Sequence, residues 1–318
     1  MYYFTWFAEG RVDVLAKYPE MLSTMYNAGL RKLQLGIESG RQETLDVYNK
    51  NITLEQIESV ILEASKYPEL TIHGNIMMAN PKESFDEYLI SIDFFKKLAQ
   101  LSDFRLDIGA TYLAPFAGTQ IRMNPGKFEM DILIENFEFR SSAMNHIICK
   151  SKKMTLSEVF SLRSFTYAKL TDFFRTEIFK YSKKEILSLT NILNKANSGI
   201  LIGGIFNQLP SFKRFFKIAA NAATLTEVSD TCLCCCPVRL WDVEFKTENG
   251  YSFTSLKNEK YTMKDLDLEL WELASGKNSL LEIHQIANSN FANEVTIEYI
   301  LSFYKKLDDN MAIVFRKY

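Results

Sequence analysis

The clearest pattern of hydrophobic and polar positions lies in residues 30–39, which read LRKLQLGIES. Leu33, Leu35 and Ile37 alternate there with polar residues or glycine, the period of two that is typical of a β-strand with one apolar and one polar face. Gly40 follows directly and ends the run. We therefore predict a strand over these residues and a turn after it.

Three more strand-like runs occur in the first part of the chain, and amphipathic helical segments separate them. The four runs begin near Tyr2, Leu30, Leu70 and Phe104. Each interval is close to or above the roughly 30 residues that one strand–helix–strand unit needs. Strands that alternate with helices predict a parallel sheet with right-handed crossovers, so the expected fold class is α/β.

Helix starts are marked by capping boxes, in which a Ser or Thr is followed three residues later by Glu or Gln. The pairs that fit this pattern are Ser39/Gln42, Thr53/Gln56, Ser84/Glu87, Thr155/Glu158, Ser182/Glu185 and Ser279/Glu282. A further helix is expected over residues 14–27, with Gly29 as its end.

Beyond the four strands, the character of the sequence changes twice. Residues 128–223 combine helical spacing with many aromatic side chains, which indicate a core more often than a cofactor site. After a run of cysteines, two short strand-like runs flank a Glu-Asn-Gly turn, and three helices and a final strand follow. The expected domains are a partial barrel (1–127), a helical subdomain (128–230), a cysteine-rich linker (231–240) and a winged-helix-like module (241–318).

Composition narrows the functional classes. The 318 residues are 47% apolar and 24% charged, with a net charge of −2, so neither a nucleic acid nor an anionic membrane is an expected partner. The sequence predicts neither a membrane span nor a signal peptide. Four of the five cysteines lie within five positions, unlike a secreted disulfide framework, so we expect a cytoplasmic protein.

Polar and small residues follow three of the predicted strands. Glu38 ends the second strand, the third runs into residues 80–84 (NPKES), and the fourth runs into residues 114–119 (APFAGT). The carboxyl ends of parallel strands lie at one edge of a sheet, where α/β proteins hold ligands. Backbone N–H groups in such turns can accept an adenine or phosphate group. Glu38 also has a second interpretation, a favourable charge at the start of the next helix.

In their order and their amino-acid sequences, these motifs resemble those of the radical S-adenosylmethionine (radical SAM) enzymes. The resemblance covers Met1 to about Met123 and rests on AEGRVD, NAGLRKLQLGIESG with LDVYNKNIT, HGNIMMANPKES and APFAGT. It looks most like the subgroup that often carries a cobalamin-binding domain. It implies a partial (β/α) TIM-like barrel of about four βα units, which binds SAM at the strand ends. In that family a [4Fe-4S] cluster reduces SAM to methionine and a 5′-deoxyadenosyl radical.

The resemblance also implies cofactor-binding residues, although it assigns no catalytic residue. The expected SAM contacts are Arg11, Glu38, Ser39, Ile76, Met77, Asn80 and Glu83. The first matches an arginine near the SAM carboxylate, and the next two match a strand end that contacts the ribose or methionine part. The last four match the strand and turn that lie against the adenine.

The sequence departs from the family in several places. The CxxxCxxC loop and the Gly-Gly-Glu-like strand are absent from these residues, so the cluster ligands are expected on a missing N-terminal barrel half or on a partner chain. The chain is accordingly expected to begin at the third barrel strand. Ala79 and Lys82 stand where the family prefers glycine, and Ala117 stands where proline is usual.

The cysteine run has two interpretations. An auxiliary iron–sulfur or zinc site would use some of its members, together with Cys149 or His146. The run comprises Cys232, Cys234, Cys235 and Cys236. Neighbouring side chains on an extended chain point to opposite faces, which favours the alternative, a linker buried against helices. In neither case is the run expected to form the radical-generating cluster.

The C-terminal module resembles the small winged-helix domains that recognise leader peptides in enzymes that mature ribosomal peptides. The resemblance rests on LELWELASGKNSLLEI and VTIEYILSFYKKLDDNMAIVF. It implies that a peptide adds as a strand to the hairpin edge and packs on the third helix. The expected contacts are Val243, Glu244, Phe245, Lys246, Ile297 and Leu301. The alternative is a generic winged helix that packs on its own enzyme.

Two functions follow from the sequence. The first is the C-terminal part of a radical SAM enzyme, with cobalamin as an additional cofactor in the related subgroup, a ribosomal peptide as a candidate target, and no activity of the chain alone. The second is a non-catalytic, degenerate relative that binds a peptide or a partner enzyme. His73 is expected to be a hydrogen-bonded core histidine, with a contact to substrate or SAM as the alternative, and His284 is expected to have a structural role.

Overall fold

The computed structural model of the chain describes residues 4–135, 146–178, 233–240, 245–247, 250–254, 260–291 and 294–317, with a few further positions between 180 and 192. The chain divides into two compact units. The first comprises residues 1–178 and 192–208, and the second comprises residues 179–191 and 209–318. The region expected as a helical subdomain is therefore shared between the two units.

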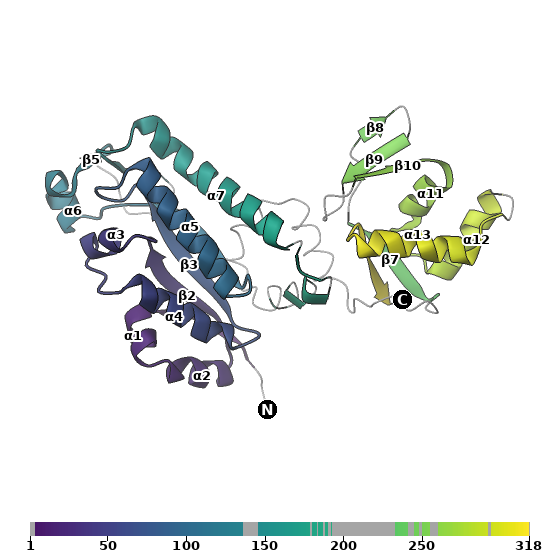
Figure 1. The fold of residues 1–318 in the computed structure, drawn as a ribbon, viewed down its shortest axis with the longest axis horizontal. Coiled ribbons are helices and arrows are strands. Elements are labelled where there is room, and N and C mark those ends of the chain that lie inside the picture. The colour runs from purple at the N-terminus through teal and green to yellow at the C-terminus, as the bar shows by residue number, and fades with distance from the viewer. Residues whose placement is uncertain are drawn as a thin grey trace. The chain divides into compact units, whose positions relative to one another are not determined.

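A four-stranded parallel sheet lies at the centre of the first unit (Figure 1). Its strands follow the chain order and are β1 (Trp6–Gly10), β2 (Leu30–Glu38), β3 (Thr71–Met78) and β4 (Leu106–Tyr112). The predicted α/β class and parallel sheet are confirmed. Among the described residues β1 pairs with β2 only, so it forms one edge of this sheet.

The helices between these strands are mostly those that the sequence predicts. They are α1 (Val12–Lys17), α2 (Glu20–Asn27), α3 (Gln42–Val47), α4 (Leu54–Ser65) and α5 (Phe85–Leu101). The single helix predicted over residues 14–27 is wrong, because the segment is divided at Pro19. A proline disfavours the helical conformation in the residue before it, and Tyr18 has φ −130° and ψ 67°.

The apolar face of the sheet is covered by α4 and α5 (Figure 1). Leu33, Leu35 and Ile37, which define the alternating pattern of β2, are all fully buried. Both helices begin at predicted capping boxes, at Thr53 and Ser84, and both bury an apolar stripe. Each fully buried leucine or isoleucine contributes about 1.5–3 kcal/mol, so this layer is the main core of the unit.

A small cap and a long helix follow β4. The cap contains α6 (Gln120–Met123), the 3₁₀ helix η1 (Pro125–Phe128), and an antiparallel pair formed by β5 (Met130–Ile132) and β6 (Cys149–Ser151). The long helix is α7 (Leu156–Ile178). The Tyr88 and Thr166 hydroxyls lie 2.7 Å apart, and the Tyr112 hydroxyl donates to the Val159 carbonyl at 3.1 Å. These bonds tie α7 to α5 and β4.

The second unit contains the hairpin, three helices and final strand that the sequence predicts. Its strands are β7 (Cys235–Arg239), β8 (Phe245–Thr247), β9 (Gly250–Thr254), β10 (Lys260–Met263) and β11 (Ile313–Lys317), and its helices are α11 (Asp265–Leu273), α12 (Leu280–Asn290) and α13 (Ile297–Asp309). Trp271 and Tyr304 are fully buried at its core. Residues 235–239, expected in a linker, instead form β7, because they pair antiparallel with β11 and Cys235 belongs to the core.

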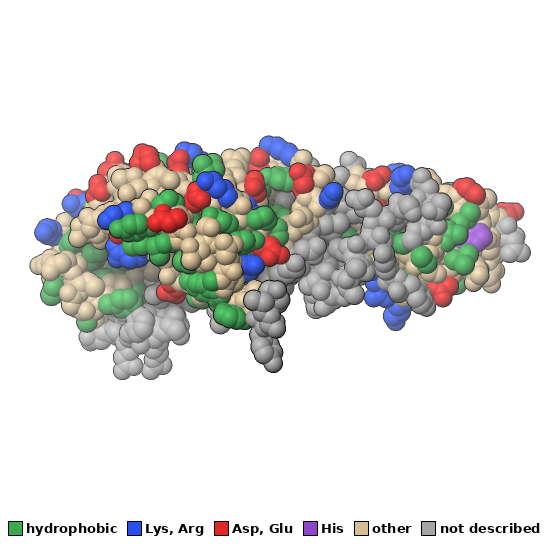
Figure 2. All heavy atoms as spheres, turned by 90° about the horizontal axis from the view of Figure 1, so that it is seen from below, with side chains coloured by type: hydrophobic (Ala, Val, Ile, Leu, Met, Phe, Trp, Pro, Cys, Tyr) green, Lys and Arg blue, Asp and Glu red, His purple; other side chains and the backbone are tan. Residues whose placement is uncertain are grey.

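The distribution of charged side chains on the surface does not point to one class of partner. On the face shown in Figure 2, acidic and basic side chains are intermixed over the described residues. No described helix combines the length and apolar character that crossing a membrane requires.

Candidate functional site at the strand ends

The candidate site lies at the carboxyl ends of β2 and β3, which are neighbours in the sheet. Glu38 at the end of β2 lies opposite Ile76 of β3. The turn after β2 leads into α3, and the turn after β3, residues 79–84, leads into α5. The fold thus brings together two sequence motifs that are about 40 residues apart in the chain.

Glu38 is held by an ion pair. Lys50 Nζ lies 2.8 Å from Glu38 Oε1, and the Glu38 side chain is 12% exposed. A Cβ at Gly36 would lie 2.6 Å from that oxygen and 3.1 Å from Lys50 Nζ, so glycine leaves the room that the pair occupies. Lys50 was not singled out from the sequence. Its signal is the stretch Asn49-Lys50-Asn51, in which both asparagines adopt φ 53°, a conformation that asparagine tolerates better than most residues.

The Ser39 hydroxyl does not cap the helix that follows it. Ser39 is fully buried, its hydroxyl lies 3.0 Å from that of Ser91 in α5, and it accepts the backbone N–H of Arg41. The capping box predicted at Ser39 is wrong, because α3 begins only after Arg41, which supplies no side-chain cap. The Ser39 hydroxyl instead ties the turn to α5.

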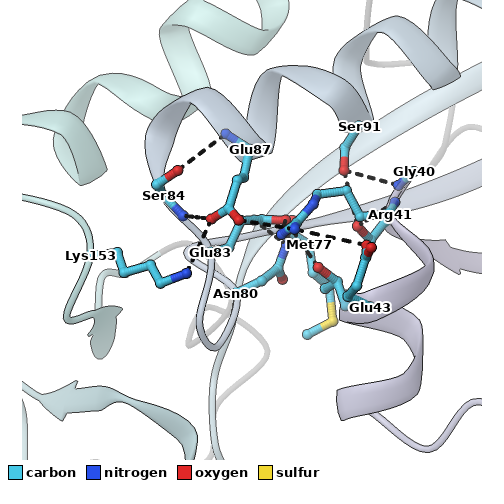
Figure 3. A network of polar contacts seen from close by, with 12 residues as sticks. Gly40, Arg41, Glu43, Met77, Asn80, Glu83, Ser84, Glu87, Ser91 and Lys153 are labelled. Carbon is cyan, nitrogen blue, oxygen red and sulfur yellow. Dashed lines mark hydrogen bonds and ion pairs between the residues drawn. The ribbon is translucent and has the colours of Figure 1, made fainter.

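The turn after β3 is organised by Asn80. Its amide nitrogen donates to Glu83 Oε2 at 2.7 Å and to the Met77 carbonyl at 3.0 Å, and its oxygen accepts the Tyr48 hydroxyl at 2.7 Å. Thr44 donates to the other Glu83 oxygen at 3.2 Å. Figure 3 shows Asn80 and Glu83 next to each other in this turn, with Arg41 beside them.

Arg41 joins the same network from the side of β2. It donates to Glu87 at 3.0 Å, and its guanidinium lies 4.0 Å from Glu83 Oε1 (Figure 3). Burial raises the pKa of Glu83 to about 7, although the hydrogen bonds from Asn80 and Thr44 and the charge of Arg41 act in the opposite direction. Burial and the charge of Glu83 also raise the pKa of Tyr48 well above its usual value.

Asn80 and Glu83 are both fully buried, and their polar atoms bond to this chain. They therefore fix the shape of the turn, in which Lys82 is exposed and Ser84 is partly exposed. Ile76 is also fully buried, whereas Met77 is half-buried and packs with Tyr48 against a small apolar cluster around Leu113 and Cys149. These predicted SAM contacts thus lie at the same edge of the sheet, but they differ in how far their side chains are exposed.

The turn has an unusual backbone at two positions. Ala79 has φ 61° and Lys82 has φ 59°, in the left-handed region. A side chain in that region costs roughly 1–2 kcal/mol, and glycine adopts it freely. These are the two positions at which the family resemblance leads one to expect glycine.

The remaining predicted residues lie apart from this network. Arg11 follows β1, is 72% exposed and pairs with Asp13 at 2.9 Å. Cys149 is buried in β6, where its thiol donates to the Leu113 carbonyl and burial raises its pKa to about 12. No group of three or more candidate metal ligands, with or without Cys149, occurs among the described residues.

The cysteine run and the peptide-binding candidates belong to the second unit. Cys234 is exposed, whereas Cys235 and Cys236 are buried in β7. Phe245 and Lys246 belong to β8, and Ile297 and Leu301 lie partly buried on α13. Cys232, Val243 and Glu244 lie outside the described residues.

Comparison with known proteins gives a limited result. No protein-family model and no curated protein matches the chain. Among solved structures, coproporphyrinogen III oxidase (HemN) from Escherichia coli, described as a radical SAM enzyme, is similar with a TM-score of 0.37 and 14% identity. The match covers 52% of this chain and 32% of that chain, so it spans about a third of the enzyme. A similarity this low does not establish a shared function.

Proposed function

We propose that this chain is part of a radical SAM enzyme and that it binds SAM at the carboxyl ends of β2 and β3. The observation that carries the proposal is the turn of residues 79–84. Its backbone keeps the glycine conformation at Ala79 and Lys82, although neither residue favours it. A strained backbone persists only where the surrounding structure holds it, and such strain clusters at functional sites.

The residues at these strand ends suit the polar groups of SAM. Glu38 offers a carboxylate to the ribose hydroxyls or the methionine ammonium, and Lys50, which now pairs with it, offers a cation to the methionine carboxylate. The turn offers backbone groups to the adenine, and Asn80 and Glu83 keep it in place. When bound and reduced by a cluster, SAM supplies a 5′-deoxyadenosyl radical.

The [4Fe-4S] cluster does not fit the described residues. Such clusters are held by several cysteine thiolates, but no three candidate ligands lie together in the described part of the chain. We therefore propose that another polypeptide segment or a partner chain supplies the cluster, and that this chain alone is inactive. A ribosomal peptide as target, recognised by the β8–β9 edge and α13, belongs to the same proposal.

Calorimetric titration of SAM into the purified chain tests the proposal, because it measures the affinity of the chain for SAM. We expect binding that Glu38→Gln weakens by about tenfold, because one charge-assisted contact is worth roughly 1.4 kcal/mol or more. Glu43→Gln is the matched control, because Glu43 is 77% exposed and lies beside the same turn. Absence of SAM binding would contradict the proposal and favour the second function, a non-catalytic protein that binds a peptide or a partner enzyme.

A further inference from the structure

A second group of buried polar side chains lies on the sheet, away from the strand ends. Side chains alternate between the two faces of a strand, so Lys32, His73 and Asp107 lie on the face opposite the apolar core. They come from β2, β3 and β4 and are only 3%, 7% and 5% exposed. Lys32 and Glu38 are six residues apart on β2, about 20 Å at ~3.3 Å per residue. This group is therefore separate from the strand-end site.

Within this group, His73 is hydrogen-bonded to neighbouring side chains of the same face. His73 Nδ1 lies 3.2 Å from Asp107 Oδ2, and His73 Nε2 lies 3.1 Å from Asn75 Oδ1. A Cβ at Gly109 would lie 2.9 Å from His73 Nε2 and 3.2 Å from Asn75 Oδ1. The expectation that His73 is hydrogen-bonded within the fold is confirmed, and Gly109 provides the space for its ring.

On this face, two charged side-chain atoms have no hydrogen-bond partner within the described part of the chain. They are Lys32 Nζ and Asp107 Oδ1, and both are inaccessible to solvent. Burial lowers the pKa of Lys32, and the charge of Asp107 opposes that shift. A buried charge without a hydrogen bond is costly, so proteins rarely keep one that nothing satisfies. Here the Lys32 ammonium and one of the two Asp107 carboxylate oxygens lack a hydrogen bond on the same face, while the other oxygen contacts His73.

We propose that this face binds the headgroup of an α-amino acid, with its carboxylate at Lys32 Nζ and its ammonium at Asp107 Oδ1. An α-amino acid carries the two complementary charges side by side, and each would form a charge-assisted hydrogen bond. The same face becomes partly exposed at Gln34, Asn75 and Gly109, two residues nearer the carboxyl ends of the strands. The site goes beyond the proposed function and does not depend on SAM binding.

Thermal unfolding of the full chain with glycine as the probe tests this site. Glycine that binds the folded chain raises its Tm, whereas acetate or methylammonium, each with half of the headgroup, has a smaller effect. We expect Lys32→Met and Asp107→Asn each to weaken the glycine effect by at least about tenfold in apparent affinity. Lys17→Met, which changes an exposed lysine, is the control and keeps the full effect.

Three results would overturn the proposal. Glycine has no effect on the wild-type Tm if ordered water alone satisfies the two atoms. An equal rise in Tm for wild type and Lys32→Met would be a general solvent effect of glycine. Without glycine, Lys32→Met is expected to fold with an unchanged or higher Tm, since an apolar side chain replaces an unpaired buried charge. Failure of that variant to fold would mean that Lys32 already has a structural partner.

Discussion

Lys82 illustrates how a single residue can keep a backbone conformation that it does not favour. It is exposed, it has φ 59°, and it stands between Pro81 and the buried Glu83. The bonds that Asn80 makes to Glu83, Met77 and Tyr48 fix the turn around it. The conformation of Lys82 is therefore imposed by its neighbours.

Replacing Lys82 with glycine should stabilise the chain. Lys82→Gly removes the steric cost of the left-handed conformation but adds backbone entropy to the unfolded state, so we expect a gain of about 1 kcal/mol in the free energy of unfolding. Lys82→Ala keeps the Cβ and should change stability little. Urea unfolding of the two variants measures the difference, and equal stabilities would contradict the backbone explanation.

Glu83 makes the stability of the chain depend on pH. Burial raises its pKa from 4.5 to about 7, so between these values the folded chain holds a proton that the unfolded chain has released. The contribution of Glu83 to the free energy of unfolding therefore falls as the pH rises from about 4.5 to about 7, and it then stays constant. At ~1.4 kcal/mol per pKa unit, the fall is on the order of 3 kcal/mol.

Urea unfolding at several pH values between about 4.5 and 8 measures this dependence. Glu83→Gln should lose the fall in stability, because the glutamine does not titrate. Glu43→Gln should retain it, since Glu43 is largely exposed. An unchanged pH slope in Glu83→Gln would show that another group is responsible.

Among the elements, the turn after β2 packs closely against helix α5, and this packing requires glycine at position 40. A Cβ at Gly40 would lie 2.8 Å from the Ser91 Cα, and the Gly40 N–H donates to the Ser91 hydroxyl at 2.9 Å. This contact allows Ser39 and Ser91 to pair, and it sets the distance between the two halves of the candidate site.

Gly40→Ala should therefore destabilise the chain by about 1–3 kcal/mol, the usual cost of overpacking. Gly126→Ala is the matched control, because a Cβ there meets nothing within 4 Å. Chemical unfolding of both variants compares the costs. Similar stabilities of the two variants would mean that α5 moves away from the turn without penalty.

At the scale of the whole molecule, the proposed function predicts an incomplete enzyme. The described residues contain no group of three or more candidate metal ligands, and β1 pairs on one side only within the described sheet. After treatment with iron and sulfide, the purified chain should bind SAM without cleaving it to 5′-deoxyadenosine. Chromatographic detection of that product above the level without iron would contradict the prediction.

Local patterns in the sequence predicted most of the described strands and helices. Alternation in β2 predicted a strand because side chains on a strand point to opposite faces, and the capping boxes at Thr53, Ser84 and Ser279 predicted helix starts because they act over three residues. Such local signals do not depend on what packs nearby. Pro19 is a local signal too, and it divides the helix predicted over residues 14–27.

Which polar side chains meet depends on the packing of segments that are distant in the chain. Ser39 has the spacing of a helix cap, but its hydroxyl pairs with Ser91, about fifty residues away in the chain. Lys50 reaches Glu38 only because β2 and the loop after α3 lie together. Residues 235–239 form a strand because β11, almost eighty residues later, provides the pairing edge. Contacts between distant segments depend on the packing of whole elements, which no local pattern encodes.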